Sequence, residues 1–351
     1  MSNLNGPMNL RPLRGALIGF GNAAIHTHLP AWQKSGHFRI DAILDPSPVQ
    51  ARLAQDLLPE ARIYSEMDTL ITNHDLDFVD ICTPPCFHAD ILLAASRAGL
   101  HVLCEKPLVT SLNSLLLVQR AAEEFRQVIF TVNNWKYAPL WIKAIELIRE
   151  KKIGAIRSIS LAVLRQPSSG GGVSPWRRRP EIAGGGILLD HGWHQFYLIL
   201  SLLQEPPRYI SARMECPQAK GSSSLEETVE VAMRFSTADV RLHLTWQASC
   251  RRNYGTIEGD RGTLLLEDDH LLLCREGLPP ARYDFSEALS ASSYHCEWMK
   301  SVIEEFHREV LDSDIRGANL TEAKWCVYLT HLAYQSHREG SCFIPVGELF
   351  I

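Results

Sequence analysis

Two side chains suited to proton transfer stand close together near the middle of the chain. Asp190 and His194 are four residues apart, so on a helix they are neighbours on one face. An imidazole titrates near neutral pH, which makes His194 the natural proton acceptor, and Asp190 can orient that ring or contact a substrate hydroxyl. The pair predicts a catalytic acid–base site, with a core packing role for the histidine as the alternative.

Lysine and arginine side chains offer two further places for ligand chemistry. Lys106 follows a short apolar run. There its ammonium group can donate a hydrogen bond to a substrate oxygen and favour a developing alkoxide, unless it is only a solvated surface lysine. Trp176 is followed by three arginines, Arg177 to Arg179, which can clamp an anionic substrate such as a phosphorylated or nucleotide-linked sugar. A solvated loop is the alternative reading of that segment.

A glycine turn near the N-terminus has the spacing of a dinucleotide site. The run Gly19-Phe20-Gly21-Asn22-Ala23-Ala24 follows a predicted strand and opens a predicted helix, the context that gives this pattern its meaning. Gly19 permits the tight turn, Gly21 lets the backbone approach a pyrophosphate, and the small Ala24 permits close helix–strand packing. The alternative is a structural turn in an α/β fold that binds no nucleotide.

An acidic residue at the end of the second strand bears on the choice of dinucleotide. Asp45 stands at that position, where a carboxylate accepts hydrogen bonds from the adenosine ribose hydroxyls. The same charge would repel a 2′-phosphate. NAD is therefore favoured over NADP as the cofactor.

The first third of the chain alternates short apolar strands with helical patterns. This order predicts βαβ units and a parallel sheet with helices on both faces. The strands are expected at 13–19, 39–44, 77–82, 101–104 and 128–132, and the helices at 24–34, 47–58, 88–98 and 112–126. Residues 13–133 are therefore expected to form a Rossmann domain, preceded by a mobile tail over residues 1–12.

The pattern changes after Asn134 to one typical of an α+β domain. Strands with period-two alternation are expected at 227–235 and 240–246, and such strands favour an open, mostly antiparallel sheet with one face covered. Shorter strands should follow to residue 273, with turns at Gly255, Gly259, Gly262 and 268–270. Helices are expected at 140–151, with Ile142, Ile145 and Ile148 on one side, and at 294–311 and 321–337. Loops are expected at 166–174 and 217–224.

Two further signatures, taken with the glycine turn, resemble those of a known family. They are Thr83-Pro84-Pro85-Cys86-Phe87-His88 and Glu105-Lys106-Pro107, each placed after a predicted strand. The chain resembles the Gfo/Idh/MocA family, named for glucose–fructose oxidoreductase, inositol dehydrogenase and a rhizopine catabolism protein. Trp176-Arg177 before Gly184-Gly185-Gly186, Asp190 and His194 resembles the motif of its second domain, and the segment 333–340 its C-terminal part.

The resemblance implies an NAD-dependent oxidoreductase acting on a secondary hydroxyl of a sugar, cyclitol or sugar derivative. It implies a cis bond between Lys106 and Pro107, and a second domain, residues 134–351, that binds substrate and forms a homodimer or homotetramer through its sheet. The implied catalytic residues are Lys106, Asp190 and His194, and Lys106, Trp176, Arg177, Asp190, His194 and Tyr197 are the implied substrate-binding residues. The implied cofactor-binding residues are Gly19, Phe20, Gly21, Asn22, Ala23, Asp45, Thr83, Pro84, His88, Glu105 and Lys106.

Two other functions remain open on this reading. Some members of the family retain NAD and use it for transient oxidation during glycoside cleavage or epimerisation, and the fold also serves a dinucleotide-sensing regulator. The presence of both Lys106 and His194 argues against a regulator, which has no need of a proton-transfer pair. For His88, packing and a cofactor contact are both open.

Tyr197 and Lys136 depart from the usual pattern of the family. Many members carry an acidic residue three positions after the histidine, where this chain has Tyr197, which either binds substrate or packs. Lys136 stands where an arginine is frequent, and it either contacts a ligand or lies on the surface. These departures leave the sugar specificity undefined.

Composition excludes several other classes of protein. The formal charge is −5 without a long cationic run, so nucleic acid is not an expected partner. No apolar stretch approaches the roughly 20 residues that span a bilayer, so a membrane is not expected either. The nine cysteines are scattered and form no Cys-x-x-Cys pair, which indicates neither a metal site nor a disulfide framework and suits the cytoplasm.

Overall fold

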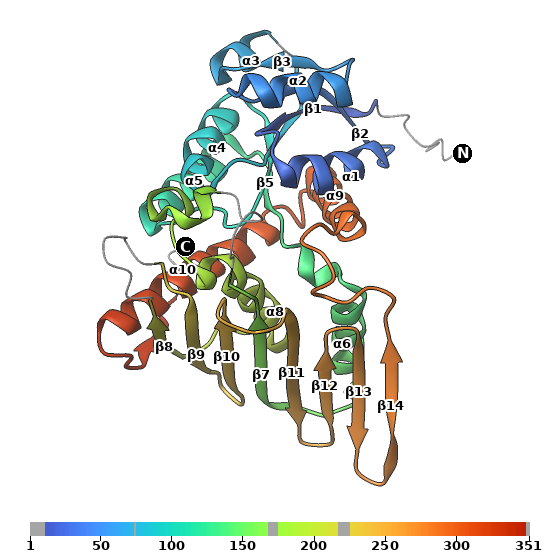
Figure 1. Ribbon diagram of the computed structural model, residues 1–351, viewed down its shortest axis with the longest axis vertical. Coiled ribbons are helices and arrows are strands. Elements are labelled where there is room, and N and C mark those ends of the chain that lie inside the picture. The colour runs from blue at the N-terminus through green and yellow to red at the C-terminus, as the bar shows by residue number, and fades with distance from the viewer. Residues whose placement is uncertain (1–10, 74, 168–174, 217–224, 349–351) are drawn as a thin grey trace, which may run out of the picture.

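The computed structural model describes residues 11–73, 75–167, 175–216 and 225–348. They form two sheets, one above the other in Figure 1, with helices between and beside them. The predicted tail lies almost wholly outside the described residues. So does most of the predicted 166–174 loop and all of the predicted 217–224 loop.

The first sheet confirms the predicted Rossmann fold. Its six strands are all parallel and lie in the order β3-β2-β1-β4-β5-β6, the order of dinucleotide-binding folds. The strands are β1 (Leu13–Ile18), β2 (Phe38–Leu44), β3 (Arg62–Tyr64), β4 (Phe78–Ile81), β5 (His101–Cys104) and β6 (Ile129–Thr131). The helices are α1 (Leu29–Gln33), α2 (Pro48–Leu57), α3 (Met67–Asn73), α4 (His88–Arg97) and α5 (Leu112–Phe125).

Alternation of side chains along each strand divides the apolar core into two layers. Ala16 and Ile18 of β1 belong to a layer that includes residues of α4 and α5. Leu17 belongs to the other layer, with Trp32 of α1. Because successive side chains point to opposite faces, a strand covered by helices on both sides must be apolar at nearly every position, as β1 is.

The second sheet has nine strands and confirms the predicted large, mostly antiparallel architecture. The order is β14-β13-β12-β11-β7-β10-β9-β8-β15, in which only the pairing of β7 with β10 is parallel. The strands are β7 (Ile156–Leu164), β8 (Tyr209–Glu215), β9 (Thr228–Arg234), β10 (Asp239–Thr245), β11 (Arg252–Gly259), β12 (Thr263–Glu267), β13 (His270–Arg275), β14 (Leu278–Asp284) and β15 (Ile344–Pro345).

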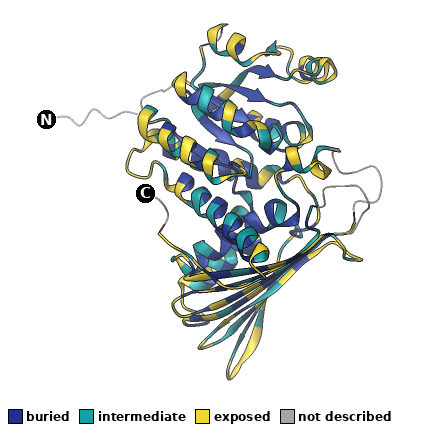
Figure 2. Ribbon diagram, turned by 90° about the vertical axis from the view of Figure 1, so that its left-hand side faces the viewer, coloured by how far each residue is buried: buried dark blue, intermediate teal, exposed yellow. Residues whose placement is uncertain are grey.

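Helices cover one face of this sheet and leave the other open, as Figure 2 shows. The covering helices are α6 (Pro139–Arg149), α8 (Trp193–Leu203) and α10 (Ala318–Arg338). Along β10 the side chains of Val240, Leu242 and Leu244 are buried, while Arg241 is exposed and His243 is partly exposed. The period-two pattern in the sequence therefore marks the covered face.

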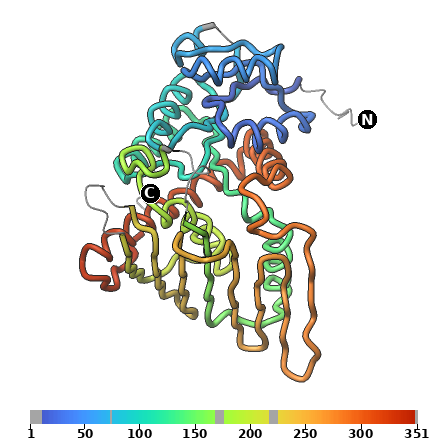
Figure 3. The backbone as a smooth tube through the Cα atoms, in the orientation of Figure 1, coloured from blue at the N-terminus to red at the C-terminus, as the bar shows by residue number. Residues whose placement is uncertain are grey.

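One helix from the C-terminal part of the chain completes the core of the first domain. Helix α9 (Cys296–Leu311) buries Met299, Val302, Ile303 and Phe306 in the same layer as Leu17. Phe306 lies against the rings of Phe38, Phe78 and Phe130, and α9 lies beside α1 in the tube drawing of Figure 3. The division at residue 133 thus separates the two sheets but not the packing.

Several local expectations were wrong. The turn expected at Gly255 is the interior of β11, where Leu161 and Ser160 of the neighbouring strand β7 leave no room for a side chain. Helix α6 does not bury Ile142, which is 51% exposed, but packs through Leu140, Trp141, Ala144 and Leu147.

Among the helices of the described segments, none has an apolar stretch long enough to span a bilayer.

Candidate active site

The glycine turn lies at the carboxyl end of β1 and has the backbone shape that its sequence predicts. Gly19 has a φ of +87°, in the region that favours glycine, and a Cβ there would meet Thr83 at 2.9 Å. At Gly21 an added Cβ would meet nothing within 4 Å, so the backbone there is open to a close ligand. Asn22 beside it is exposed. These positions fit a bound pyrophosphate.

Asp45 ties this turn to the end of β2. Its Oδ2 accepts a hydrogen bond from the Phe20 amide at 2.7 Å, and its Oδ1 accepts one from the Ser47 amide at 2.9 Å. The Phe20 ring is fully buried in the core, so the structure gives this predicted cofactor residue a packing role. Each Asp45 oxygen keeps a further lone pair for a ribose hydroxyl.

The loop after β4 lies against the same turn. Thr83 and Pro84 are partly exposed beside Gly19, and the Thr83 hydroxyl oxygen is buried with no partner among the described residues. His88 is fully buried, and its ring nitrogens lie 2.8 Å from the carbonyl oxygens of Thr83 and Pro107. It therefore connects two loops, which corrects its assignment as a cofactor contact.

Lys106 and Asp190 come from different domains and meet at this edge of the parallel sheet. The Lys106 Nζ donates to the Asp190 Oδ1 at 2.8 Å and to the Asp190 carbonyl oxygen at 2.7 Å. The bond between Lys106 and Pro107 is cis, as the resemblance implied. Burial alone would raise the pKa of Asp190, but the Lys106 charge, aided by His191 and Arg177, holds it well below its ordinary value.

Asp190 lies on a π-helical turn, Leu188–Gly192, that leads directly into α8. The turn begins after Gly186, whose amide donates to the Glu226 Oε1 at 2.9 Å. Single π turns are rare and frequently occur at functional sites. A second π turn, Ala24–His28, follows the glycine turn, so both irregular turns border this site.

His194, at the start of α8, is held by two neighbours. Its ring stacks on Trp135, with ring centroids 4.7 Å apart and planes 10° apart. Its Nδ1 lies 2.9 Å from the Tyr197 hydroxyl oxygen, which accepts a hydrogen bond from the Trp135 amide. Burial, with the nearby Lys106 charge, holds the pKa of His194 well below its ordinary value, so the ring is neutral at pH 7.

Tyr197 does not face a ligand, because its side chain is fully buried behind His194. The structure thus favours packing over the predicted substrate contact. For Lys136 the structure favours a structural role over a ligand contact, because its ammonium pairs with Glu322 of α10 at 3.1 Å.

His191 is a neighbour of the site that the sequence did not single out. Its Nε2 lies 3.5 Å from the Asp190 Oδ2, and its Nδ1 is buried with no partner among the described residues. Burial lowers the pKa of His191 to about 3 against the opposing charge of Asp190. In the sequence, only its position between Asp190 and His194 could have indicated that His191 belongs to the site.

The arginine segment is only partly directed at this site. The Arg177 guanidinium stacks over the Trp176 ring at 4.3 Å, and its charge contributes to the low pKa of Asp190. Arg179 instead pairs with Glu181 at 2.8 Å. Arg177 is therefore the member of the predicted clamp that the structure brings near Asp190.

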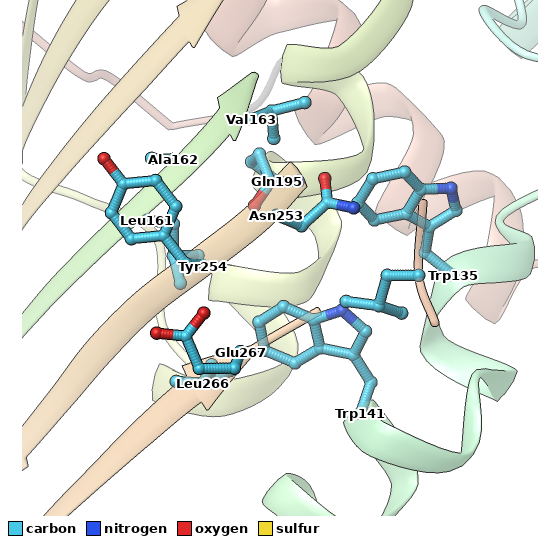
Figure 4. A pocket seen from close by; sticks show the side chains of 11 residues that line it. Trp135, Trp141, Leu161, Ala162, Val163, Gln195, Asn253, Tyr254, Leu266 and Glu267 are labelled. Atoms are coloured by element: carbon cyan, nitrogen blue, oxygen red, sulfur yellow. The ribbon is translucent and has the colours of Figure 1, made fainter. Parts of the chain in front are cut away.

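A small pocket lies behind Trp135, between α6, α8 and the covered face of the second sheet (Figure 4). Trp135, Trp141 and Gln195 face the strands β7, β11 and β12 across it. Its cavity volume is about 10 Å³, which is room for about one water molecule. It is too small to admit a sugar.

Comparison with known proteins assigns the two halves of the chain to one family. Residues 13–134 match the model of the oxidoreductase family with an NAD-binding Rossmann fold, Gfo/Idh/MocA, and residues 141–265 match a C-terminal domain of the same family. The chain belongs to the Gfo/Idh/MocA oxidoreductases. Its first domain therefore has the NAD-binding Rossmann fold of this oxidoreductase family.

Relatives within the Gfo/Idh/MocA family include named sugar dehydrogenases. Levoglucosan dehydrogenase of Pseudarthrobacter phenanthrenivorans is 29% identical, over 74% of this chain and 73% of that enzyme. D-xylose 1-dehydrogenase (NADP(+)) 2 of Haloferax volcanii is 31% identical over 49% of this chain. The chain spans 52% of the length of that enzyme. It is also 30% identical to an uncharacterized protein of Saccharomyces cerevisiae and spans 57% of the length of that protein.

A solved structure of levoglucosan dehydrogenase in complex with NADH shares the fold of this Gfo/Idh/MocA protein. The TM-score is 0.83 at 21% sequence identity, and the match covers 96% of this chain and all of that one. This likeness extends the family assignment to the arrangement of the two sheets.

Proposed function

We propose that this protein is an NAD-dependent dehydrogenase that transfers hydride between the nicotinamide and a secondary hydroxyl or ketone of a sugar, cyclitol or sugar derivative. The observation that carries the proposal is the contact between the Lys106 Nζ and the Asp190 Oδ1 at 2.8 Å, beside a buried and neutral His194. An ammonium, a carboxylate and an imidazole then surround the space where a reacting hydroxyl would lie.

Lys106 holds the reacting oxygen and stabilises the negative charge that develops on it. Asp190 fixes the ammonium in place and offers an acceptor to a neighbouring hydroxyl of the substrate. Its low pKa keeps it ionised through the physiological range, so it accepts hydrogen bonds and donates none.

His194 takes the hydroxyl proton at its Nε2. This requires the other ring nitrogen to carry the proton of the neutral imidazole and to donate it to the Tyr197 oxygen at 2.9 Å. That oxygen has two lone pairs, of which one already accepts the Trp135 amide. Trp135 and Tyr197 are therefore positioning residues for His194.

The residues that would hold NAD border the same site. Gly19, Gly21, Asn22 and Ala23 would bind its pyrophosphate, Asp45 its adenosine ribose, and Thr83, Pro84, Glu105 and Lys106 its nicotinamide half. When bound, NAD supplies the hydride acceptor, and in the reverse direction NADH supplies the hydride. The Asp45 carboxylate favours NAD over NADP, although the xylose dehydrogenase relative uses NADP.

Turnover with a panel of sugars and cyclitols tests this proposal. Wild-type protein is expected to form NADH from NAD, and more slowly NADPH from NADP. Lys106→Ala and His194→Ala should each lower kcat by roughly 10²- to 10⁴-fold, while NAD still raises the melting temperature of both variants. Full activity in both would contradict the assignment, and product without net NADH would indicate transient oxidation by retained NAD.

Two further proposals concern the assembly and the location of the protein, and the open face of the second sheet supports the first. We expect it to join copies of the chain into a homodimer or homotetramer, which sedimentation measurements would test. All nine cysteines lie in the described segments and are free thiols, which suits the reducing environment of the cytoplasm.

A further inference from the structure

A buried charge network lies behind Lys106, and its central histidine has no role in the chemistry proposed above. Its centre is His28, a fully buried residue at the end of the π turn that follows the glycine turn. The His28 Nδ1 lies 2.8 Å from the Asp80 Oδ2, and its Nε2 lies 3.0 Å from the Glu105 Oε1. Each ring nitrogen therefore faces a carboxylate oxygen.

These contacts define the charge of the His28 ring. A neutral imidazole has one N–H and one lone pair, so it would direct that lone pair at a carboxylate. With both nitrogens protonated, the ring donates to Asp80 and to Glu105 at once. Burial alone would lower the pKa of His28, but the Asp80 carboxylate raises it well above the ordinary value, in agreement with an imidazolium ion.

The residue types of this group could also hold a metal ion. His28, Asp80 and Cys82 place their ligand atoms within 4.8 Å of one another. However, the Asp80 Oδ2 already accepts from His28 and, at 2.7 Å, from the Trp32 Nε1, and the Cys82 thiol lies 3.7 Å from the Asp80 Oδ1. Donors of the protein itself therefore occupy the Asp80 oxygens, and the group forms a hydrogen-bond network.

Glu105 carries this network to the reactive lysine. Its Oε1 accepts from His28, and its Oε2 accepts from the Lys106 backbone amide at 3.0 Å. A carboxylate held at both oxygens cannot rotate without breaking one of the bonds. The orientation of the Lys106 backbone is thus connected through Glu105 to a histidine on the helical segment that the glycine turn begins.

We propose that His28 is a positioning residue for Lys106. His28 fixes the Glu105 carboxylate in the orientation that holds the Lys106 amide. This inference rests on the proposed function only for the role of Lys106 in turnover. The effect on Glu105 itself is independent of any substrate.

Two charge effects follow from the same contacts. Burial alone would raise the pKa of Glu105, but the hydrogen bond and charge of His28, with the Lys106 charge, keep it below the ordinary value. Without His28, burial becomes dominant and the pKa of Glu105 rises. The other titratable groups near Glu105 are Cys82, Cys104 and His88.

His28→Leu is the test variant and Trp32→Phe its matched control. Trp32 is also buried, at 2% exposure, and bonds the same Asp80 oxygen, but its indole hydrogen bond ends at Asp80 and not at Glu105. His28→Gln is a second variant that keeps one donor without a charge, for use if the leucine variant does not fold.

Carbon-13 NMR of protein labelled at the glutamate carboxyls gives the first readout, with the Glu105 signal assigned from Glu105→Gln. In wild type and Trp32→Phe this signal should not titrate between pH 5 and 8. In His28→Leu it should titrate within that range, and in His28→Gln its pKa should be raised by a smaller amount. A Glu105 signal unchanged in both His28 variants would overturn the proposal.

Turnover gives the second readout. In His28→Leu kcat should fall by roughly 10- to 100-fold, the effect expected of a displacement of about 1 Å at a reacting group, while the NADH dissociation constant changes by less than about 3-fold. An equal loss of kcat in Trp32→Phe would overturn the positioning role. If the wild type turns over no sugar or cyclitol, the proposed function fails while the NMR result still decides the Glu105 link.

Discussion

At His194 the immediate neighbours decide which ring nitrogen can take a proton. Relatives with an acidic residue three positions later could place a carboxylate behind the ring, whereas this chain has the neutral hydroxyl of Tyr197. A carboxylate would stabilise the imidazolium ion that forms on proton transfer, and a hydroxyl does so less. Burial and the nearby Lys106 charge keep His194 neutral well below pH 7, and the fully buried Tyr197 offers no negative charge to offset them.

Tyr197→Phe tests this arrangement at the scale of one oxygen atom. Without the hydroxyl, the His194 Nδ1 and the Trp135 amide both lose their partner, so kcat should fall by roughly 10-fold or more. The free energy of unfolding should fall by about 1–3 kcal/mol. The measurement is kcat against pH together with urea denaturation.

Ser336→Ala is the control, because it removes another fully buried hydroxyl that accepts a backbone amide, that of Ala212 at 3.0 Å. It should lose stability and keep the wild-type pH profile of kcat. If the two variants have the same profile, Tyr197 has no role in proton transfer.

Residue types and spacing singled out the candidate reactive residues but not their surroundings. The helical spacing of Asp190 and His194 suggested that they are neighbours, whereas the structure pairs Asp190 with Lys106 and His194 with Tyr197; Lys106 was assigned through its motif. Trp135 and His28 could not be predicted as part of the site, because each reaches it from a distant segment and its role depends on a buried contact. The burial of Tyr197 was equally hidden, since an exposed and an inward tyrosine look the same in a sequence.

Among the elements of the candidate site, the turn that leads into α8 has little room for change. A Cβ at Gly186 would lie 2.1 Å from the Glu226 carbonyl oxygen, and the Gly186 and Leu188 amides both donate to the Glu226 Oε1. The loop before β9 (Thr228–Arg234) therefore fixes the point from which the π turn carries Asp190 toward Lys106.

Gly186→Ala should displace this turn and separate Asp190 from Lys106. We expect a loss of about 1–3 kcal/mol in the free energy of unfolding and a roughly 10²-fold fall in kcat, measured by denaturation and initial rates. Gly36→Ala serves as the control, since a Cβ there meets nothing within 4 Å and its effect should be negligible. A Gly186→Ala protein with wild-type kcat would contradict this role of the turn.

Elements with a strong periodic pattern were predictable, and irregular ones were not. The strands β1 and β10 were predicted within one or two residues because their apolar patterns are long. The short β3 and α3 (Met67–Asn73) were missed, as were the longer β7, β8 and β14, and the π turns were read as ordinary helix, because one inserted residue leaves no periodic signal. In α6 the isoleucines did not mark the centre of the buried face, since Ile142 is exposed and Ile145 and Ile148 are only partly buried beside Trp141 and Ala144.

For the whole molecule, buried histidines predict how stability depends on pH. Burial lowers the pKa of His101 to about 4 and of His191 to about 3, against about 6.5 in an unfolded chain. Between pH 4 and 6.5 the unfolded chain thus binds more protons, so stability falls as pH falls. The contribution of His28 to stability changes with pH in the opposite direction. Because its pKa is raised in the folded state, the stability that it adds is lost as pH rises above 6.5.

Urea denaturation from pH 4 to 9 should therefore show a maximum near pH 6.5, with a loss of about 1–3 kcal/mol by pH 4. His101→Gln should reduce the slope on the acid side, because protonation of the His101 Nδ1 removes the acceptor of the Val128 amide. His28→Leu should reduce the slope on the alkaline side. Equal slopes in the wild type and both variants would show that other groups control the pH dependence.

The position of α9 has a consequence for the order in which the protein is made. A ribosome completes all six strands of the nucleotide-binding sheet about 175 residues before it reaches Phe306, which closes the layer over Phe38, Phe78 and Phe130. Until then the nascent chain presents three aromatic rings without their cover. The core of the first domain is thus completed only when α9 has been made, and a nascent chain in this interval exposes apolar surface of the kind that chaperones bind.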